Sequence, residues 1–156
     1  MALKGEKVEE TVETRISLPV EAYLPDDYVP DSRQKVSIYK KIAGLKNPEA
    51  LNELREELKD RYGAIPEPAE MLLEVANIKQ LSQHLGIIAI VAGKEQVKVT
   101  FDERKPRINV KKFVEIVHQS RDLELQPPAQ LKIRMPGVTG TNMLAELQQT
   151  LKLFVV

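Results

Sequence analysis

The sequence places four carboxylates within one short stretch, and their spacing indicates a binding site more directly than any other feature. They are Glu53, Glu56, Glu57 and Asp60. Two pairs of them are four residues apart, which on a helix makes like-charge neighbours that each cost about 0.2–0.5 kcal/mol. An arginine-bearing partner would offset this cost by bidentate pairing. The alternative is an ordinary solvated helix face, because Lys59 and Arg61 lie among the carboxylates and relieve part of the repulsion.

A second candidate is the basic stretch "RKPRINVKK", which could contact the phosphates of a nucleic acid. Its cations are Arg104, Lys105, Arg107, Lys111 and Lys112. No aromatic residue is interleaved for base stacking, as single-strand binding platforms require. Asp102 and Glu103 come directly before the stretch and partly neutralise it. A solvated loop and helix face is therefore the competing interpretation.

Catalytic, cofactor-binding and metal-binding patterns are not found. His84 and His118 are far apart in the sequence, and each falls near the end of a predicted helix, where a cation is mildly favourable. The absence of cysteine excludes disulfides, thiolate metal sites and a cysteine nucleophile. The nearest approach to a phosphate loop, "GVTG" at 137–140, lacks the required lysine and spacing. We therefore expect a non-enzymatic domain with no metal and no cofactor.

Composition narrows the class of protein further. The 156 residues suit one domain, and 42% apolar residues suffice for a core. Aromatic residues are only 4%, so that core must be aliphatic. Lys plus Arg equals Asp plus Glu at 23 each, which argues against a dedicated nucleic-acid or membrane binder. No membrane span or signal sequence is evident, and the lack of cysteine fits a reducing compartment, so a cytoplasmic location is expected.

The carboxylates would be positioned by the middle member of a central three-helix segment. Asp31 or Ser32 can cap a first helix that ends at Gly44, and Asn47 with Pro48 can start a second. Gly63 would end the second helix, and a third, broadly apolar helix would run from Pro66 or Pro68 to Gly86. Helical spacing predicts which residues of the first two helices face inward. In the first helix they are Val36, Tyr39, Ile42 and Ala43. In the second they are Leu51, Leu54, Leu58 and Tyr62.

The flanking segments predict a small sheet. Alternation over 15–20 indicates a strand, which must be at an edge because Pro19 cannot donate to a ladder. The apolar run 87–92 and the alternating run 97–101 predict a hairpin with a buried first strand. A weak strand and a better one with Leu131, Ile133 and Met135 would follow. Two further helices would follow. Asn109 would cap the first, whose inward-facing residues would be Val110, Phe113, Val114 and Val117. Thr141 would cap the second, whose inward-facing residues would be Met143, Leu144, Leu147 and Leu151. The predicted class is α+β, with helices packed on a small, largely antiparallel sheet.

Two blocks of sequence resemble a known family. They are "AYLPDDYVPDSRQKVSIYKKIA" at 22–43 and "LREELKDRYGAIPEPAEMLLEVANIKQLSQHLGI" at 54–87. Both resemble the C-terminal domain of the bacterial transcription-repair coupling factors, strongly over about residues 14–90 and by order and length thereafter. The opening "ALKGEKVEE" is similar to the linker that follows the translocase motor in that family. The resemblance implies a linker over residues 1–13 and a C-terminal regulatory domain over 14–156.

The resemblance also implies a role. In that family the full-length protein recognises stalled RNA polymerase, displaces it with an ATP-driven DNA translocase and recruits the excision-repair protein UvrA. The C-terminal domain docks on a UvrB-like module of its own chain and masks the surface that UvrA uses. Carried over to this sequence, the contact would involve Glu57 and Asp60, with Arg61 matching the same motif. RNA polymerase and DNA would be bound only by other domains.

Overall fold

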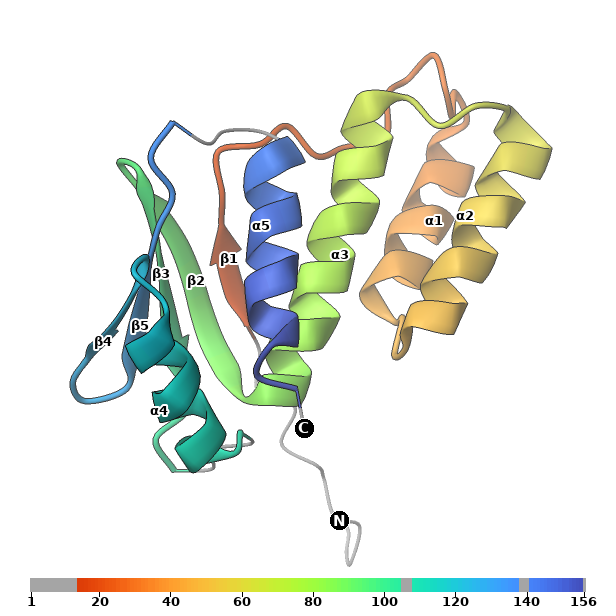
Figure 1. Cartoon of the computed structure of the whole chain (residues 1–156). Helices are drawn as coiled ribbons and strands as arrows, with labels where there is room; N and C mark the ends of the chain where they lie inside the picture. The colour runs from red at the N-terminus through yellow and green to blue at the C-terminus, as the bar shows by residue number, and fades with distance from the viewer. Residues whose placement is uncertain (1–13, 105–107, 138–140, 156) are drawn as a thin grey trace, which may run out of the picture.

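The computed structural model describes residues 14–104, 108–137 and 141–155 (Figure 1). Its elements, in chain order, are β1 (Arg15–Ser17), α1 (Ser32–Ala43), α2 (Pro48–Tyr62), α3 (Glu67–Leu85), β2 (Ile87–Gly93), β3 (Gln96–Phe101), α4 (Val110–Gln119), β4 (Leu123–Gln126), β5 (Gln130–Arg134) and α5 (Thr141–Lys152). The α+β prediction is confirmed. The predicted linker over 1–13 and the predicted capping side chain of Thr141 lie outside the described residues.

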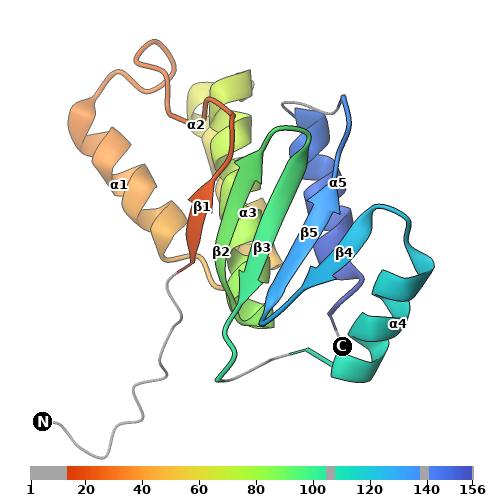
Figure 2. The same cartoon turned by 90° about the vertical axis from the view of Figure 1, so that its left-hand side faces the viewer.

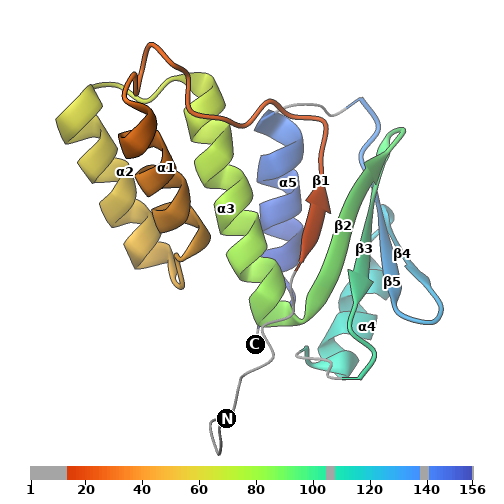
Figure 3. The same ribbon diagram turned by 180° about the vertical axis from the view of Figure 1, so that it is seen from behind.

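The strands form one sheet in the order β1-β2-β3-β5-β4. β1 pairs with β2 in parallel, and the other three pairings are antiparallel, as a largely antiparallel sheet requires. Helices α3 and α5 cover one face of this sheet, and α1 and α2 lie beyond α3, away from the sheet (Figures 1 and 3). The acidic stretch therefore lies on the side of the molecule opposite the sheet.

The first strand is shorter than the alternation predicts. It lies at the sheet edge, as expected, but it ends at Ser17 instead of continuing to Val20. The backbone turns sharply there, because the N–H of Val20 donates to the carbonyl of Leu18 at 2.8 Å. Pro19 lacks the N–H that a continuing ladder would need. Leu18 and Val20 still pack against the sheet, although they are no longer part of it.

The predicted helix caps of the three-helix segment are present. Asp31 begins α1, where its Oδ1 accepts hydrogen bonds from the N–H groups of Arg33 and Gln34 at 2.8 and 3.1 Å. Asn47 begins α2 in the same way, accepting from the N–H of Ala50 at 2.8 Å. Gly63 ends α2 with φ 90° and ψ −163°, a conformation open essentially to glycine alone. These local signals fix where α2 starts and stops, and hence where its carboxylates lie.

Two hydrophobic clusters hold the fold together, and α3 belongs to both. The sheet core joins the inner face of the sheet to α5 and to one side of α3, through residues such as Ile78, Leu85 and Leu147. The helical core joins α1 and α2 to the other side of α3, through Leu54, Leu58 and Leu73. Burying an aliphatic side chain of this size contributes about 1.5–3 kcal/mol. Because it contributes apolar residues to both clusters, α3 is the central helix of the molecule.

Two predictions of inward-facing residues in α1 are wrong, and one buried residue was not predicted. Val36 is 53% exposed and Ala43 is exposed, whereas Ile38, which the helical pattern omitted, is only 3% exposed. Tyr39 and Ile42 do pack against the helical core, but they remain partly exposed. The buried stripe of α1 is thus rotated toward Ile38, because the helix contacts α3 along a narrow line and leaves Val36 on its outer side.

The short helix α4 also differs from expectation. Val110 and Val114 are 57% and 37% exposed, so they do not face inward as predicted. Phe113 does, because it is the residue that enters the sheet core, with ring centroids 5.4 Å from Phe101 and 4.8 Å from Phe154. One aromatic cluster anchors the helix, and Val117 packs against the sheet core as predicted, whereas Val110 and Val114 remain at the surface.

The continuous apolar sequence of β2 suggested a strand that is buried on both faces. In the structure β2 is buried on one face only. Ile87 and Ile90 are fully buried, but Ile88 and Val91 are 37% and 38% exposed. Helices cover one face of the sheet only, and its other face is open toward the viewer in Figure 2. The predicted inward alternation of Leu131, Ile133 and Met135 is confirmed. The residues of α5 that were predicted to face inward are also buried, namely Met143, Leu144, Leu147 and Leu151.

Candidate functional site

The helix α2 presents its carboxylates to solvent because its other side is fixed in the helical core. Leu51, Leu54 and Leu58 are at most 5% exposed and set the rotation of the helix. The opposite side carries the acidic surface, which consists of Glu53, Glu56, Glu57 and Asp60. Together with Asn52 and Arg61, these residues line a shallow depression of about 550 Å³. The sequence-predicted cluster is therefore a single contiguous surface.

Glu57 is not a free carboxylate. Its Oε2 lies 3.0 Å from Nζ of Lys41 on α1 and 3.9 Å from Nη1 of Arg61 on the next turn of α2. Its side chain is only 39% exposed. Lys41 was not identified as a site residue from sequence, because its proximity to Glu57 depends on how α1 packs beside α2. Glu57 thus has a role in joining two helices whatever else it binds.

The other three carboxylates are more available. Among the described residues Glu56 reaches only Nζ of Lys59, at 4.0 Å, and its own side chain is largely exposed while that of Lys59 is half exposed. Glu53 and Asp60 are exposed and form no ion pair or side-chain hydrogen bond with any described residue. Asp60 also lies in the last turn of α2, where the helix dipole disfavours an anion. An external cation would therefore gain most at Asp60 and Glu53.

The end of α2 is held by two tyrosines. The hydroxyl of Tyr28 donates toward the carbonyl of Gly63 at 2.9 Å, and the hydroxyl of Tyr62 donates to Oε1 of Gln34 at 2.7 Å. The two rings pack with centroids 5.7 Å apart. Burial raises the pKa of the Tyr28 phenol, and the neighbouring Tyr62 adds to the shift. The turn after Asp60 is thereby fixed, which keeps the acidic surface in one orientation.

Arg61, predicted as a partner-binding residue, is already engaged within the domain. Its guanidinium carbon lies 5.3 Å from the ring centroid of Tyr62, on which it stacks. It is also the weaker of the two cations beside Glu57. Half of its side chain remains exposed at the edge of the acidic surface. Arg61 can therefore border a bound partner, although its sign opposes that of the carboxylates.

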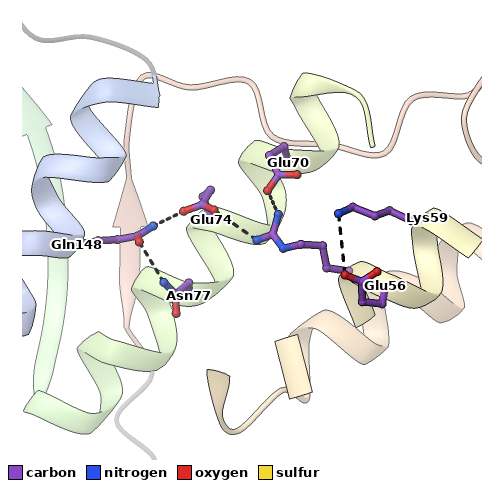
Figure 4. A network of polar contacts seen from close by, with 7 residues as sticks. Glu56, Lys59, Glu70, Glu74, Asn77 and Gln148 are labelled. Atoms are coloured by element: carbon purple, nitrogen blue, oxygen red, sulfur yellow. Dashed lines mark hydrogen bonds and ion pairs between the residues drawn. The ribbon is translucent and has the colours of Figure 1, made fainter. Parts of the chain in front are cut away.

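A polar network lies on the other side of α2 and was not predicted. Arg55 forms ion pairs with Glu70 and Glu74 of α3, the latter with Nη2 and Oε1 3.4 Å apart. Glu74 accepts a hydrogen bond from Gln148 of α5, which in turn accepts one from Asn77 at 3.1 Å (Figure 4). The network links α2, α3 and α5 across the boundary of the two cores. It makes the position of the acidic surface depend on the body of the domain.

The basic stretch from 104 to 112 is not assembled into one site within the described residues. Arg104 folds back on Asp102, with its backbone N–H 2.9 Å and its Nε 3.6 Å from Oδ1 of that buried carboxylate. Lys105 and Arg107 lie outside the described residues. Lys111 and Lys112 are exposed in the first turn of α4. All three described cations of the stretch are thus exposed, but Arg104 pairs with Asp102 while Lys111 and Lys112 are solvated side chains of α4.

Two other kinds of site are absent from the described residues. None of their helices is both long enough and apolar enough to span a bilayer. They also contain no group of three or more His, Cys, Asp or Glu side chains placed to hold a metal ion.

Comparison with known proteins assigns the chain to a family. The family model described as the TRCF domain matches residues 18–113, well over half of the chain. The chain belongs to the TRCF domain family. The matched residues run from the end of β1 to α4, and so include α2, its acidic surface and the turn that follows.

Curated relatives carry the same identity. The transcription-repair-coupling factor of Escherichia coli (strain K12) is 34% identical over 121 residues, which are 77% of this chain and 10% of that protein. The corresponding factor of Myxococcus xanthus is 28% identical over 152 residues, which are 96% of this chain and 13% of that protein. The chain thus spans about a tenth of the length of the curated relatives that it matches.

A solved structure supports the fold of this TRCF domain. It is described as the crystal structure of the C-terminal domain of a transcription-repair coupling factor, and it matches with a TM-score of 0.78. The match covers 91% of this chain and 94% of that one, at 23% sequence identity. The match covers a larger share of this chain than the family model, which ends at residue 113, so the likeness of fold extends beyond that residue.

Proposed function

We propose that this TRCF domain is a non-catalytic, autoinhibitory C-terminal domain of a transcription-repair coupling factor. In this proposal the acidic surface of α2 docks on the UvrB-like module of the same full-length chain and masks the surface that UvrA uses. The observation that carries the proposal is the exposure of Glu53 and Asp60 without any described partner, on a helix whose other side is fixed in the helical core. An arginine-bearing surface is the partner that such carboxylates fit.

The geometry suits a contact that must release. Exposed charges provide specificity and salt-sensitive engagement more than raw affinity. The docking partner is tethered in the same chain, so its effective concentration is high and a weak contact is sufficient. A flat acidic depression without deep apolar pockets meets both requirements.

The activities of the parent protein are part of the same proposal. The curated relatives are about eight to ten times longer than the matched segment, so other domains would contain the ATP-dependent translocase that moves along DNA and the contacts with RNA polymerase. The present chain would restrain that motor and contribute no chemistry of its own. Its release would expose the UvrA site in transcription-coupled nucleotide-excision repair.

The test uses the full-length protein with Glu53→Ala and Asp60→Ala combined. Neither carboxylate has an ion-pair partner among the described residues, so the domain should remain folded. We expect UvrA binding to tighten by about tenfold, which corresponds to about 1.4 kcal/mol of lost docking energy, and the ATPase rate to rise. Glu115→Ala, at an exposed position of the distant helix α4, is the matched control. Unchanged UvrA binding in the double variant would reject the acidic surface as the docking site.

A further inference from the structure

The outer face of the sheet is a second uncovered surface, on the side of the molecule away from the acidic surface. Helices α3 and α5 pack on the inner face, and in Figure 2 the outer face lies open in front of them. Strand pairing identifies its residues, because partners in register point to the same side. Val97, Val99 and Leu131 point inward and are fully buried, so the alternate positions form the outer face.

The charge of this outer face is one-sided. Its cations are Arg15, Lys98, Lys132 and Arg134, and its one carboxylate in the described strands is Glu124. Glu124 lies 4.0 Å from Lys132, whereas Arg15, Lys98 and Arg134 form no ion pair with a described residue. The chain as a whole has no net charge, so the excess of cations on this face is balanced by an excess of carboxylates elsewhere in the chain. The outer face is a positive surface on a neutral protein.

The pairing register places two of these cations directly side by side. Lys98 of β3 is opposite Lys132 of β5. Like charges opposite each other in an antiparallel pair are destabilising, and the single neighbouring carboxylate offsets this only for Lys132. Arg134 is two residues further along β5, about 6.8 Å away, and neighbouring strands are about 4.8 Å apart. An anionic ligand with closely repeated charges would relieve the repulsion at all three positions.

The remaining side chains indicate what kind of anion fits. Ala89 and the exposed Val91 of β2 lie on this face, and five neutral hydrogen-bonding residues share it: Ser17, Gln96, Thr100, Gln126 and Gln130. Lys, Arg, Ser, Thr and Gln are the side chains that contact phosphate and sugar in nucleic-acid complexes. Protein interfaces are instead enriched in aromatic residues, methionine and arginine, and depleted in lysine. The outer face contains no aromatic residue and no methionine among its described strand positions.

We propose that the outer face of the sheet binds the sugar–phosphate backbone of a nucleic acid duplex, without reading its sequence. The flat surface lacks the aromatic platforms on which unpaired bases stack, so a duplex fits better than a single strand. This site is distinct from the acidic surface, and it also differs from the stretch at 104–112, which the sequence alone suggested. The two surfaces lie on different sides of the domain, so docking and backbone contact can be tested separately.

The experiment titrates the 156-residue chain with a 16-base-pair duplex of arbitrary sequence and follows backbone amide shifts by nuclear magnetic resonance. At 50 mM salt we expect saturable shifts at β3 and β5. Three phosphate contacts predict about 40-fold weaker binding at 200 mM salt. The triple variant Lys98→Gln, Lys132→Gln and Arg134→Gln should bind at least about tenfold more weakly, and the magnitude of its salt slope should fall by about 2.7.

Two controls decide between the alternatives. The matched variant Arg104→Gln, Lys111→Gln and Lys112→Gln removes as many cations and should bind the duplex as the unchanged chain does. Polyglutamate of equal charge serves as an acidic protein-like polymer and should bind at least about tenfold more weakly than the duplex. Shifts that map to 104–112, equal loss in both variants, tighter binding of polyglutamate, or no shifts at 1 mM duplex would each overturn the proposal.

Discussion

Lys41 Nζ lies 3.0 Å from Oε2 of Glu57 and joins α1 to α2 at the edge of the acidic surface. The two residues come from the two separate sequence blocks that carry the family resemblance. Glu57 therefore has a structural partner inside the domain, whereas Asp60, one turn further along, has none among the described residues. A change in UvrA binding caused by Glu57→Ala alone would mix two effects, and Asp60 is the cleaner probe.

The Lys41–Glu57 pair should contribute little to stability. Both side chains are about half exposed, so a double-mutant cycle with Lys41→Ala and Glu57→Ala should give a coupling of about 0.2–1 kcal/mol. Urea unfolding of the four proteins measures it. Asp60→Ala, run in parallel, should leave the free energy of unfolding within about 0.5 kcal/mol of the unchanged chain. A coupling above 2 kcal/mol would show that Glu57 is primarily a structural residue.

Arg55 should matter more, because its partners are partly buried. Arg55→Met keeps the apolar stem but leaves Glu70 and Glu74 without their shared cation, and we expect a loss of about 1–3 kcal/mol. Lys59→Met, on the exposed side of the same helix, is the matched control and should change stability by less than about 0.5 kcal/mol. Chemical denaturation measures both. Equal losses in the two variants would show that the network contributes nothing specific.

Gly63 should not tolerate any side chain. An added Cβ would meet no atom within 4 Å, so the cost of Gly63→Ala comes only from its φ of 90° and should be about 1–3 kcal/mol. Gly44→Ala is the control, because Gly44 ends α1 at φ −94° and an added Cβ would make only ordinary contacts. The midpoints of thermal unfolding compare the two. The conformation assigned to Gly63 would be contradicted if both variants were equally stable.

The raised pKa of Tyr28 predicts that the folded domain loses stability at alkaline pH. Burial is the main cause of its raised pKa, so the folded state keeps the phenol proton at a pH where the unfolded chain, with a pKa near 10, has released it. The contribution is complete below about pH 10 and is lost as the pH rises through the higher folded-state pKa. The urea concentration at the midpoint of unfolding, measured at several pH values, should fall less steeply above pH 10 in Tyr28→Phe than in the unchanged chain. Tyr23→Phe, at an exposed tyrosine, should keep the steep fall.

Much of the fold could be predicted because its signals are local. Asp31, Asn47 and Gly63 each act within one turn of chain, so their roles follow from residue type and position alone. The acidic surface was predictable for the same reason, since the spacing of Leu51, Leu54 and Leu58 fixes which side of α2 is exposed. Confirmed features of this kind depend on short-range stereochemistry.

The features that were missed depend on tertiary contacts. Lys41 and Arg55 read as ordinary surface cations until α1 and α3 are placed beside α2. Val36 was predicted to face inward because helical spacing identifies an apolar stripe on α1. The spacing does not show along which line α3 contacts α1. The basic outer face was missed because its cations come from β1, β3 and β5, and only the strand register brings them together. No local pattern contains that information.

The most direct test of the central claim is a titration of the 156-residue chain against the isolated UvrB-like module, with salt varied. We predict saturable binding that weakens as salt rises from 50 to 500 mM, because the contact is made by exposed charges. Asp60→Lys should abolish it, and Glu115→Lys should not. Binding that is indifferent to both salt and Asp60→Lys, or no binding at 50 mM salt and millimolar protein, would contradict docking through the acidic surface.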